Sequence, residues 1–502
     1  MNIAILTQTI QTTRDYITSL KWGSLNCSTR LLVISVSIIL LAACSSETPP
    51  TQTEVIETLE ITPSPTSTAT QIPPTPTVTP QPTSSLGLKP SDLNGVKATF
   101  WHPWSGETEK AVQESIAEFN ASNEFGLTVE GISQGTIDAL YEMIDSAETA
   151  SVLPNLALGA NYQIQSWISA GKPVTSLNTF VDDPEWGLSA EELSDFYPVF
   201  LEQDLNEQIR FGFPAIRTAP LIFYNSSWGK ELGFSSPPSS TDEFMEQACA
   251  AVLANNRNDL PEDDGTGGWL IDTTPSGVLS WIYAFGSSVT LPDGSGYKFN
   301  SPQTADSFQF LKDLFDQGCA WELLESSAEV EFANRRALFI TNSLGDIDDQ
   351  REELELAENN DLWTVMGFPT PSGEAVIDVY GPSYVIFAGT PEENLASWLV
   401  IKWLSTPEQA AKIAAARGTF PTRASALESL DSFARGNPQW AVAQELLAVA
   451  QPEPGLESWN AVRWILGDVG TQLFRYYFTP ERIPATLELM DETAAELHEL
   501  TN

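Results

Sequence analysis

Histidine, cysteine and positive charge are all scarce in this 502-residue chain. It contains two histidines (His102 and His498), four cysteines, and 24 Lys and Arg against 67 Asp and Glu, for a formal net charge of −43. Two histidines leave almost nothing from which to build a His-based metal site or a catalytic triad. The shortage of Lys and Arg argues against nucleic-acid binding, which depends on neutralising phosphates. Neutral or cationic ligands are the easier partners for such an acidic chain.

Long apolar runs are missing as well, apart from one near the N-terminus. Residues 31–41 are largely apolar, but a permanent membrane-spanning helix needs roughly 20 such residues. Lys21 and Arg30 precede the run, and two alanines follow it, as in a secretory signal peptide. We therefore expect a cleaved leader rather than a transmembrane anchor.

The end of this run resembles the lipobox of bacterial lipoproteins. Leu41-Ala-Ala-Cys44 places a cysteine directly after the small pair. In that family the cysteine thiol takes a diacylglycerol and becomes the new N-terminus. We expect residues 1–43 to be a lipoprotein signal peptide, with Cys44 lipidated and the protein held on the extracytoplasmic face of the cell membrane (cell surface or periplasm). The alternative is a signal peptide cut near Ala43 that leaves the cysteine unmodified.

The remaining cysteines fit an exported protein. Cys27 would leave with the signal peptide, and Cys249 and Cys319 remain in the mature chain beside the anchor. Two cysteines in an oxidising compartment predict one disulfide. Two buried free thiols are the alternative, because sequence does not show whether the Cα atoms lie close enough.

Residues 44–93 are predicted to be a disordered tether. Half of the residues between 47 and 90 are Thr or Pro. Such a segment cannot bury enough apolar surface to offset its chain entropy, and its prolines favour an extended conformation.

From about Gly95 the chain is globular and too long for one core, so we expect two lobes. Strand patterns at 96–101, 221–224 and 384–388 alternate with helical periodicity, for example over 109–120. This alternation predicts an α/β fold. Four helix starts carry a hydroxyl before proline, namely Ser301, Thr390, Thr406 and Thr479, and two of these also match the capping box.

Several segments, in order, resemble the extracellular solute-binding proteins of family 1, the sugar-binding subunits of ABC importers. The matching segments are Thr99–Glu107, Ala117–Asn120, Phe213–Pro214, Leu221–Asn225, Gly233–Pro238, Asp242–Phe244, Phe299–Pro302, Leu311–Gly318, Gly418–Arg423 and Trp459–Arg463. The last is similar to the Trp-x-Ala-Val-Arg segment of maltose-binding proteins. Each motif is weak alone, but their order over some 400 residues makes the resemblance specific.

The resemblance implies a periplasmic binding protein type II fold, in which two α/β lobes are joined by a hinge with a ligand cleft between them. Lobe 1 would comprise residues 94–217 and 380–425, and lobe 2 residues 218–379 and 426–502. The crossing segments would lie near Thr218–Leu221, near Tyr380–Gly381 and around 425–430. Ligand would then stabilise the closed arrangement of the lobes.

Sugar recognition needs aromatic faces and planar polar groups in a preformed cleft. The end of the first strand supplies Trp104, Ser105 and Glu107, at the strand edge where open α/β sheets bind ligands. Strand alternation makes Trp101 a core residue, so we favour Trp104 as the cleft residue. Asn161 follows a second predicted strand, with an ordinary turn as the alternative.

Other candidates come from the second half of the chain. Trp281 and Tyr283 share a face if their segment is a strand, and belong to the core if it is helical. Ser343 follows an apolar run and is placed to reach a hydroxyl. Arg217 would pair a ligand carboxylate, such as that of a uronic acid, or form a structural salt bridge.

Three aromatic residues complete the predicted site. Tyr380 falls at an expected crossing, Phe420 lies in the Gly-x-aromatic-Pro loop, and Trp459 is the best single stacking candidate, because its counterpart lines the maltose site in the resembled family. Core packing is the alternative for an aromatic residue in an apolar helix.

We therefore expect a monomeric, non-enzymatic protein that needs no cofactor or metal. It would capture a carbohydrate, in the first place a neutral oligosaccharide, and deliver it to the transmembrane subunits of an ABC permease. A surface sensor without transport is the alternative. A hydrolase would need paired carboxylates or an activated nucleophile, and neither is evident in the sequence. Metal capture through Tyr476-Tyr477 is the third rival, although that pair lies in an apolar helical stretch.

Overall fold

The computed structural model describes residues 84–149, 152–206, 208–323 and 326–501. The expected signal peptide, the expected lipidation site at Cys44 and most of the expected tether lie outside these residues. The described residues all belong to one compact unit. Within the described residues, no helix combines the length and the apolar character that crossing a membrane requires.

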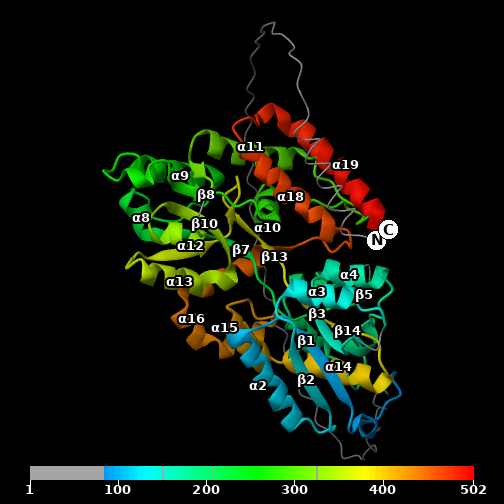
Figure 1. Cartoon of the computed structure of the whole chain (residues 1–502). Coiled ribbons are helices and arrows are strands. Elements are labelled where there is room, and N and C mark those ends of the chain that lie inside the picture. Colours follow the sequence, from blue (N-terminus) through cyan, green and yellow to red (C-terminus); the bar gives the residue numbers. More distant parts are fainter. Residues whose placement is uncertain (1–83, 150–151, 207, 324–325, 502) are drawn as a thin grey trace, which may run out of the picture. The chain divides into compact units, whose positions relative to one another are not determined.

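Helices and strands alternate along the described chain (Figure 1). The first part contains η1 (Pro90–Leu93), β1 (Lys97–His102), α2 (Gly106–Ser122), β2 (Thr128–Ser133), α3 (Ile137–Asp145), β3 (Leu156–Gly159), α4 (Asn161–Ser169), α5 (Asn178–Val181), α6 (Ala190–Ser194), α7 (Pro198–Glu202), β4 (Leu205–Asn206), β5 (Ile209–Arg210) and β6 (Phe213–Pro214). The middle part contains β7 (Pro220–Asn225), α8 (Ser226–Glu231), α9 (Thr241–Asn255), η3 (Pro261–Asp263), β8 (Gly267–Leu270), α10 (Pro275–Ala284), α11 (Pro302–Asp316), β9 (Ala320–Trp321), α12 (Ala328–Ala333), β10 (Ala337–Ser343), η4 (Leu344–Asp346), α13 (Ile347–Leu356), β11 (Trp363–Met366), β12 (Phe368–Pro369) and β13 (Ala375–Val379). The last part contains β14 (Ser383–Ile386), α14 (Pro391–Leu404), α15 (Pro407–Arg417), η5 (Ala424–Ser429), α16 (Asp431–Gly436), α17 (Pro438–Glu445), η6 (Leu446–Val449), β15 (Ala450–Pro452), α18 (Trp459–Leu473), η7 (Pro480–Arg482) and α19 (Ile483–Thr501).

Lobe 1 is built around a five-stranded sheet of order β2-β1-β3-β14-β6. The first three strands run parallel, and β14 joins from far along the chain in the antiparallel direction. Alternate residues of β1, namely Ala98, Phe100 and His102, are buried on one face. Trp101, which the alternation was expected to place in the core, lies on the other face and is only half-buried. Helices α2, α3 and α14 pack around this sheet (Figure 1).

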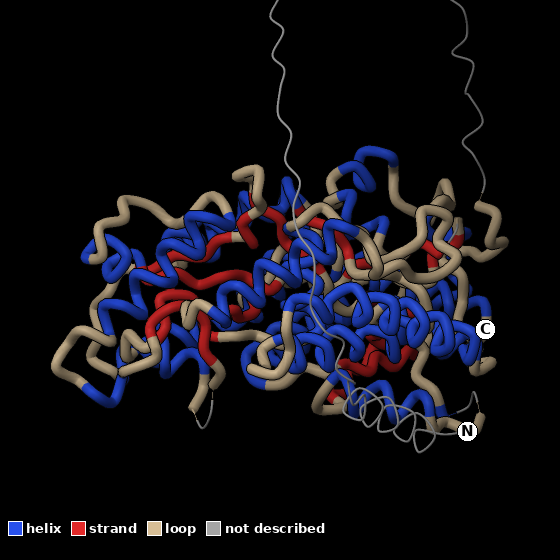
Figure 2. The backbone as a smooth tube through the Cα atoms, turned by 90° about the horizontal axis from the view of Figure 1, so that it is seen from above, coloured by secondary structure: helices blue, strands red, loops and turns tan. Residues whose placement is uncertain are grey.

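Lobe 2 is built around a second five-stranded sheet, of order β11-β7-β10-β8-β9. All six residues of β7 are buried, because both faces of its sheet are covered. Ile222 and Tyr224 point into one apolar core, which α9, α10, α11, α18 and α19 help to form. Leu221 and Phe223 point into another, which α12, α15 and α17 help to form. Viewed from above, the strands lie among surrounding helices (Figure 2).

Two chain segments cross between the lobes side by side. Thr218 bridges Tyr380, and Arg217 bridges Phe420, each in the antiparallel direction. A small sheet of order β12-β13-β15 lies beside them, with β15 parallel to β13. The crossings thus bring three distant parts of the chain to one place.

The predicted helix starts are largely confirmed. Ser301 caps α11 by accepting from the Thr304 backbone N–H, and Thr390 forms a full capping box with Glu393 at α14. Thr406 does not cap α15 with its side chain, because its hydroxyl donates instead to the backbone oxygen of Trp403 at 2.9 Å. Thr479 likewise makes no side-chain cap and precedes the short 3-10 helix η7.

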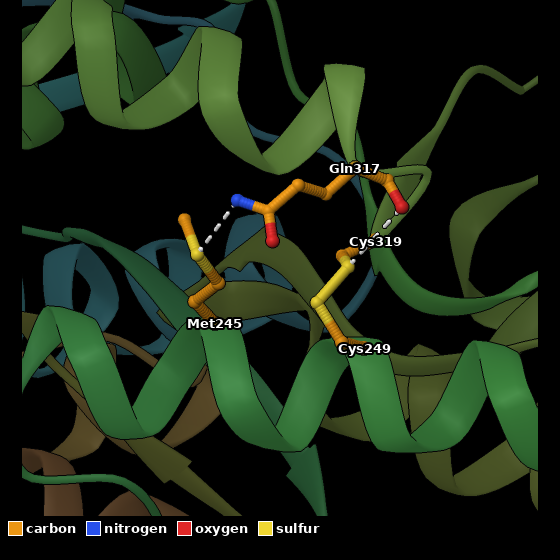
Figure 3. The surroundings of a disulfide bond; sticks show 4 residues. All are labelled: Met245, Cys249, Gln317 and Cys319. Atoms are coloured by element: carbon orange, nitrogen blue, oxygen red, sulfur yellow. Dashed lines mark hydrogen bonds between the residues drawn. A yellow bond between two sulfur atoms is a disulfide. The ribbon is translucent and has the colours of Figure 1, made fainter.

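A disulfide links α9 to the start of β9 (Figure 3). It joins Cys249 to Cys319, whose Cα atoms are 4.5 Å apart. The side-chain amide of Gln317 donates to the sulfur of Met245 beside it, at 3.3 Å. The bond closes a loop of 70 residues in lobe 2, which limits the freedom of the unfolded chain.

Candidate functional site

A cavity of about 730 Å³ lies between the two lobes. Its walls come from the loop after β1, from α3 and α4 in lobe 1, from the crossing segments, and from η4 and α18 on the side of lobe 2. Parallel strands β1 and β3 end at this edge, so the loops that follow them meet here. The volume is within the usual range of ligand cavities, roughly 300–1,000 Å³.

Trp104 belongs to the apolar core of lobe 1 and is 6% exposed, and the part of it that reaches the cavity forms the aromatic part of the lobe 1 wall. Its ring stacks on the imidazole of His102, with centroids 5.5 Å apart and planes 24° apart, and meets the edge of Phe100. Burial lowers the pKa of His102 to about 4, against a raising effect of the Trp104 backbone. The imidazole is therefore neutral at physiological pH, and Trp104 packs against an uncharged, buried ring.

Helix α18 forms the facing wall from lobe 2. Its apolar residues Trp459, Val462 and Leu466 recur at helical spacing and are buried in the core. The neighbouring face turns Asn460, Arg463 and Trp464 toward the cavity. Trp464 is 55% exposed, although it is a large apolar residue, and the Arg463 guanidinium lies 5.8 Å from its ring centroid. An exposed aromatic face in a cavity is available to a ligand.

Charged groups gather at the end of the cavity nearest the crossings. We call Arg463, Glu453 and Asp378 the Arg463 cluster. Arg463 donates to the hydroxyl of Tyr162, and one of its nitrogens lies 3.8 Å from Glu453 Oε1. Tyr162, Tyr380, Glu453 and Arg463 line the cavity, whereas Asp378 is completely buried.

Burial dominates the electrostatics of the Arg463 cluster. It raises the pKa of Asp378 well above its usual value, and the charge of Glu453 raises it further, against Arg463. Burial also raises the pKa of Glu453, while Arg463 and the Trp459 indole favour its ionised form. The pKa of Tyr162 rises to about 12, again chiefly through burial. Neither Asp378 oxygen, nor Glu453 Oε1, has a hydrogen-bond partner among the described residues.

Three side-chain contacts join α18 and its preceding loop to lobe 1. Besides the bond between Arg463 and Tyr162, Ser169 donates to Glu457 at 2.5 Å, and Asn460 donates to Tyr141 at 3.5 Å. These contacts tie the two walls of the cavity together on one side.

The structure brings four of the predicted ligand-binding residues together. Trp104, Ser105, Ser343 and Tyr380 all line the cavity. Ser105 precedes α2 and makes no capping bond with its side chain, and Ser343 shares a hydrogen bond of 2.9 Å with Thr218. Burial raises the pKa of Tyr380 well above its usual value.

The other predicted residues lie elsewhere, and each has a physical reason. Trp459 is fully buried in the core of lobe 2, stacked on Tyr297 with centroids 5.9 Å apart. Phe420 is buried in the second core of lobe 2, although its neighbour Thr419 reaches the cavity. Glu107 points to solvent and pairs with Lys110 at 3.2 Å.

Two further aromatic candidates belong to a helix rather than a strand. Trp281 and Tyr283 lie on α10, which is buried throughout its length from Gly277 onward. Trp281 packs in the core, and Tyr283 donates its hydroxyl to the backbone oxygen of Pro452 at 3.0 Å. Asn161, the first residue of α4, is buried and donates to the backbone oxygen of Gln203 at 2.6 Å. None of these three side chains lines the cavity.

Arg217 takes the structural role that the sequence left open. It is completely buried and pairs with Asp204 at 2.9 Å, while Ser383 donates to the other Asp204 oxygen at 2.5 Å. Its guanidinium also donates to the backbone oxygens of Ile216 and Pro382, each at 2.9 Å. We call Arg217, Asp204 and Ser383 the Arg217 cluster. It fastens the crossing segments instead of facing a ligand.

Sequence reasoning missed the residues that distinguish this cavity, namely Tyr162, Glu453, Arg463 and Trp464. The apolar spacing of Trp459, Val462 and Leu466 was a usable signal, since it assigns Trp459 to the core face and Trp464 to a different face. No comparable signal marks Glu453, which reaches the site only because β15 pairs with β13.

Nothing in the described part of the chain forms a group of three or more His, Cys, Asp or Glu placed to hold a metal ion. Tyr476 and Tyr477 are 90% and 58% exposed beyond the end of α18 and lie outside the cavity lining. This arrangement corrects the expectation that the tyrosine pair is packed in an apolar helix.

Comparison with known proteins assigns both a family and a fold. A family model described as bacterial extracellular solute-binding protein matches residues 114–441. No curated protein matches the chain. Among solved structures, the sugar-binding protein MalE from the phytopathogen Xanthomonas citri has a TM-score of 0.68 at 20% identity, over 80% of this chain and 98% of that one.

Two further structures show how broad the likeness is. The cyclic alpha-maltosyl-1,6-maltose binding protein from Arthrobacter globiformis has a TM-score of 0.67 at 16% identity, over 80% of this chain and 99% of that one. UgpB from Mycobacterium tuberculosis, in complex with glycerophosphocholine, has a TM-score of 0.63 at 17% identity, over 81% and 99% of the two chains. At these identities the likeness is one of fold, and it confirms the predicted periplasmic binding protein type II architecture.

Proposed function

Because the chain belongs to the bacterial extracellular solute-binding proteins, we propose that it captures a carbohydrate between its lobes and delivers it to an ABC-type import permease. Lobe closure on the ligand would create the form that the permease recognises, since only then does the ligand touch both walls. In this proposal the protein is a binding protein and catalyses no reaction.

The observation that carries this proposal is the pair of tryptophans in the cavity. Trp104 comes from lobe 1 and Trp464 from α18, and both line the same space. The apolar C–H face of a pyranose packs well on an indole ring, and hydroxyls need polar partners beside it. Ser105, Ser343 and Tyr380 supply such partners. We therefore propose these three residues, with Trp104 and Trp464, as ligand contacts.

The fold alone leaves the ligand open. The compared MalE protein is named as sugar-binding, whereas the compared UgpB structure holds glycerophosphocholine. The described cavity favours sugar because two aromatic rings line it, and because Arg463 is already engaged by Tyr162 and lies near Glu453. A phosphodiester would have to compete for that guanidinium.

Anchoring and delivery follow from the sequence. A lipid on Cys44 and the Thr- and Pro-rich tether would keep the lobes near the membrane while allowing them to reach a permease. The lobe boundaries given above, with hinges near Thr218 and Tyr380, are part of the same proposal.

A thermal-shift panel on the purified full chain tests the function. Maltotriose, tagatose, glycerophosphocholine, amino acids and ferric ion are each added in excess, and the midpoint of unfolding is measured. A ligand that binds only the native state raises this midpoint. We expect a shift with an oligosaccharide such as maltotriose.

The proposal would be contradicted if only the ligands other than sugars raised the unfolding midpoint. Stabilisation only by glycerophosphocholine would replace sugar with a phosphodiester as the ligand class. Stabilisation only by ferric ion or amino acids would contradict the carbohydrate assignment outright.

A further inference from the structure

Glu453 is buried at the cavity, and one of its carboxylate oxygens accepts no hydrogen bond from the described residues. The residue is 6% exposed and lines the cavity. Its Oε1 is buried and has no hydrogen-bond partner among the described residues, and Arg463 Nη2 is 3.8 Å away, beyond hydrogen-bond distance. The other donor beside Glu453 is the Trp459 indole, which favours the ionised form and whose Nε1 also lacks a hydrogen bond there. An ionised carboxylate only accepts hydrogen bonds. An unpartnered carboxylate oxygen at the cavity therefore suits a hydrogen-bond donor.

The groups around Glu453 keep the negative charge on it. Asp378 from β13 is its acidic neighbour, and Arg463 approaches from α18. The tyrosines near the pair are Tyr162, Tyr283 and Tyr380. Two buried carboxyl groups with one arginine are not both ionised at low cost. Burial raises the pKa of Asp378 more strongly, while Arg463 favours the ionised form of Glu453. The proton therefore belongs on Asp378 and the charge on Glu453.

Arg463 does not satisfy the carboxylate of Glu453, because its guanidinium is also bonded to Tyr162. It donates to the Tyr162 hydroxyl from lobe 1, and its Nε is buried without a hydrogen-bond partner. A buried polar atom left without a partner costs free energy. The Arg217 cluster, in contrast, satisfies both carboxylate oxygens of Asp204. Other buried polar atoms also lack a hydrogen-bond partner, Arg217 Nε and Glu331 Oε2 among them. Among the described carboxylates with such an oxygen, however, Glu453 is the one that lines the cavity.

We infer that Glu453 is a specificity-determining residue of the cavity, which accepts a hydrogen bond from a hydroxyl of the ligand. This inference rests on the carbohydrate-binding function proposed above and assigns one of its contacts. A hydroxyl supplies the missing donor without adding charge. A phosphate or carboxylate placed there would be repelled, so Glu453 selects neutral polyhydroxyl ligands over anionic ones.

Titration calorimetry with maltotriose tests this role in the purified full chain. Glu453→Gln keeps the shape of the side chain but removes the charge, and Glu488→Gln, at an exposed position on α19, is the matched control. We expect the maltotriose affinity at pH 8 to fall roughly 10- to 100-fold in Glu453→Gln, as for loss of a charged hydrogen bond. The control should bind like the wild type.

The pH profile separates ligand contact from a structural role. Because the ligand hydroxyl favours the ionised form of Glu453, wild-type affinity should rise with pH as Glu453 ionises, and Glu453→Gln should lose that rise. Asp378→Asn removes the neighbouring acid, so the rise should move to lower pH while the affinity at pH 8 is kept. This second variant decides the question if Glu453→Gln folds poorly.

The outcomes of these experiments distinguish failure of the Glu453 role from failure of the proposed function. Wild-type maltotriose affinity and pH dependence in Glu453→Gln, or an unshifted profile in Asp378→Asn, would overturn the role of Glu453 while leaving carbohydrate binding intact. No wild-type response to any sugar in the thermal-shift panel would overturn the proposed function, and this inference with it.

Discussion

Two buried clusters of charge lie near the crossing segments, and they are built on opposite plans. In the Arg217 cluster, both oxygens of Asp204 receive hydrogen bonds, from Arg217 at 2.9 Å and from Ser383 at 2.5 Å, although Arg217 Nε has no partner among the described residues. In the Arg463 cluster, both oxygens of Asp378 and one of Glu453 have no partner among the described residues. Both clusters are withdrawn from water, so the difference is not one of exposure. It indicates that the first cluster serves the fold and the second serves the cavity that it borders.

The largest expected effect comes from breaking the satisfied cluster. Asp204→Asn would leave the completely buried guanidinium of Arg217 without its counter-charge. Removing one partner of a buried pair typically costs about 3–5 kcal/mol of unfolding free energy. Urea denaturation at pH 7 measures this loss. A cost below about 1 kcal/mol would mean that the Arg217 cluster does not hold the crossings together.

The tryptophans of α18 extend the comparison from charge to packing. Trp459→Ala would open a void in the core of lobe 2 and should cost about 3–5 kcal/mol of unfolding free energy. Trp464→Ala, five residues later, should change stability by less than about 1 kcal/mol, because the side chain is 55% exposed. Equal destabilisation by the two variants would place Trp464 in the core as well.

A substitution in the Arg463 cluster should instead raise the stability of the folded protein. The raised pKa of Asp378 means that its ionisation is costlier in the folded state than in the unfolded state. Its contribution to stability is therefore fully present below the unfolded pKa, about 4, and is lost as pH rises toward the folded value. Asp378→Asn escapes that loss and should be more stable than the wild type by about 1–3 kcal/mol at pH 8.

Urea midpoints of the two proteins at pH 5 and pH 8 test this direction. The advantage of Asp378→Asn should shrink at pH 5, where the wild-type carboxyl is neutral in the folded protein and largely ionised only after unfolding. An advantage that is absent at pH 8, or that grows toward acid, would contradict the electrostatic difference between the clusters.

The smallest effect is expected where the lobes meet at the surface. Glu457→Gln weakens the bond that Ser169 donates across the lobes, with Ser169 itself exposed. Exposed polar contacts are worth about 0–1 kcal/mol, so ligand affinity should change less than about fivefold. Calorimetry with maltotriose measures this. A larger loss of affinity would mean that the surface contact between Ser169 and Glu457, rather than the buried clusters, controls lobe closure.

The sequence was sufficient for the fold and for part of the site. Strand alternation, capping residues and ordered motifs predicted the α/β lobes, because these features depend on neighbours in the chain. Trp104 and Ser105 were found because the loop after the first strand has a fixed place at the sheet edge. Local patterns did not predict every detail, however. Thr406 has the sequence of a capping residue, but its hydroxyl donates to the backbone oxygen of Trp403 instead of capping α15.

The rest of the site depends on contacts between distant segments. Trp459 was predicted for the cleft from a motif, but the phase of α18 turns it into the core and presents Trp464 instead. Glu453 and Asp378 are neighbours only because β15 lies parallel to β13, with each pair of facing residues 73 positions apart in the chain (450 − 377). No local pattern of residues encodes such an encounter.

The most direct test of the central claim, that the cavity between the lobes binds a carbohydrate, is a maltotriose titration of wild type and Trp464→Ala. We predict that the wild type binds and that Trp464→Ala loses about tenfold or more in affinity, with an unchanged melting temperature in the absence of ligand. Wild-type affinity in Trp464→Ala, or no binding by the wild type, would contradict that claim.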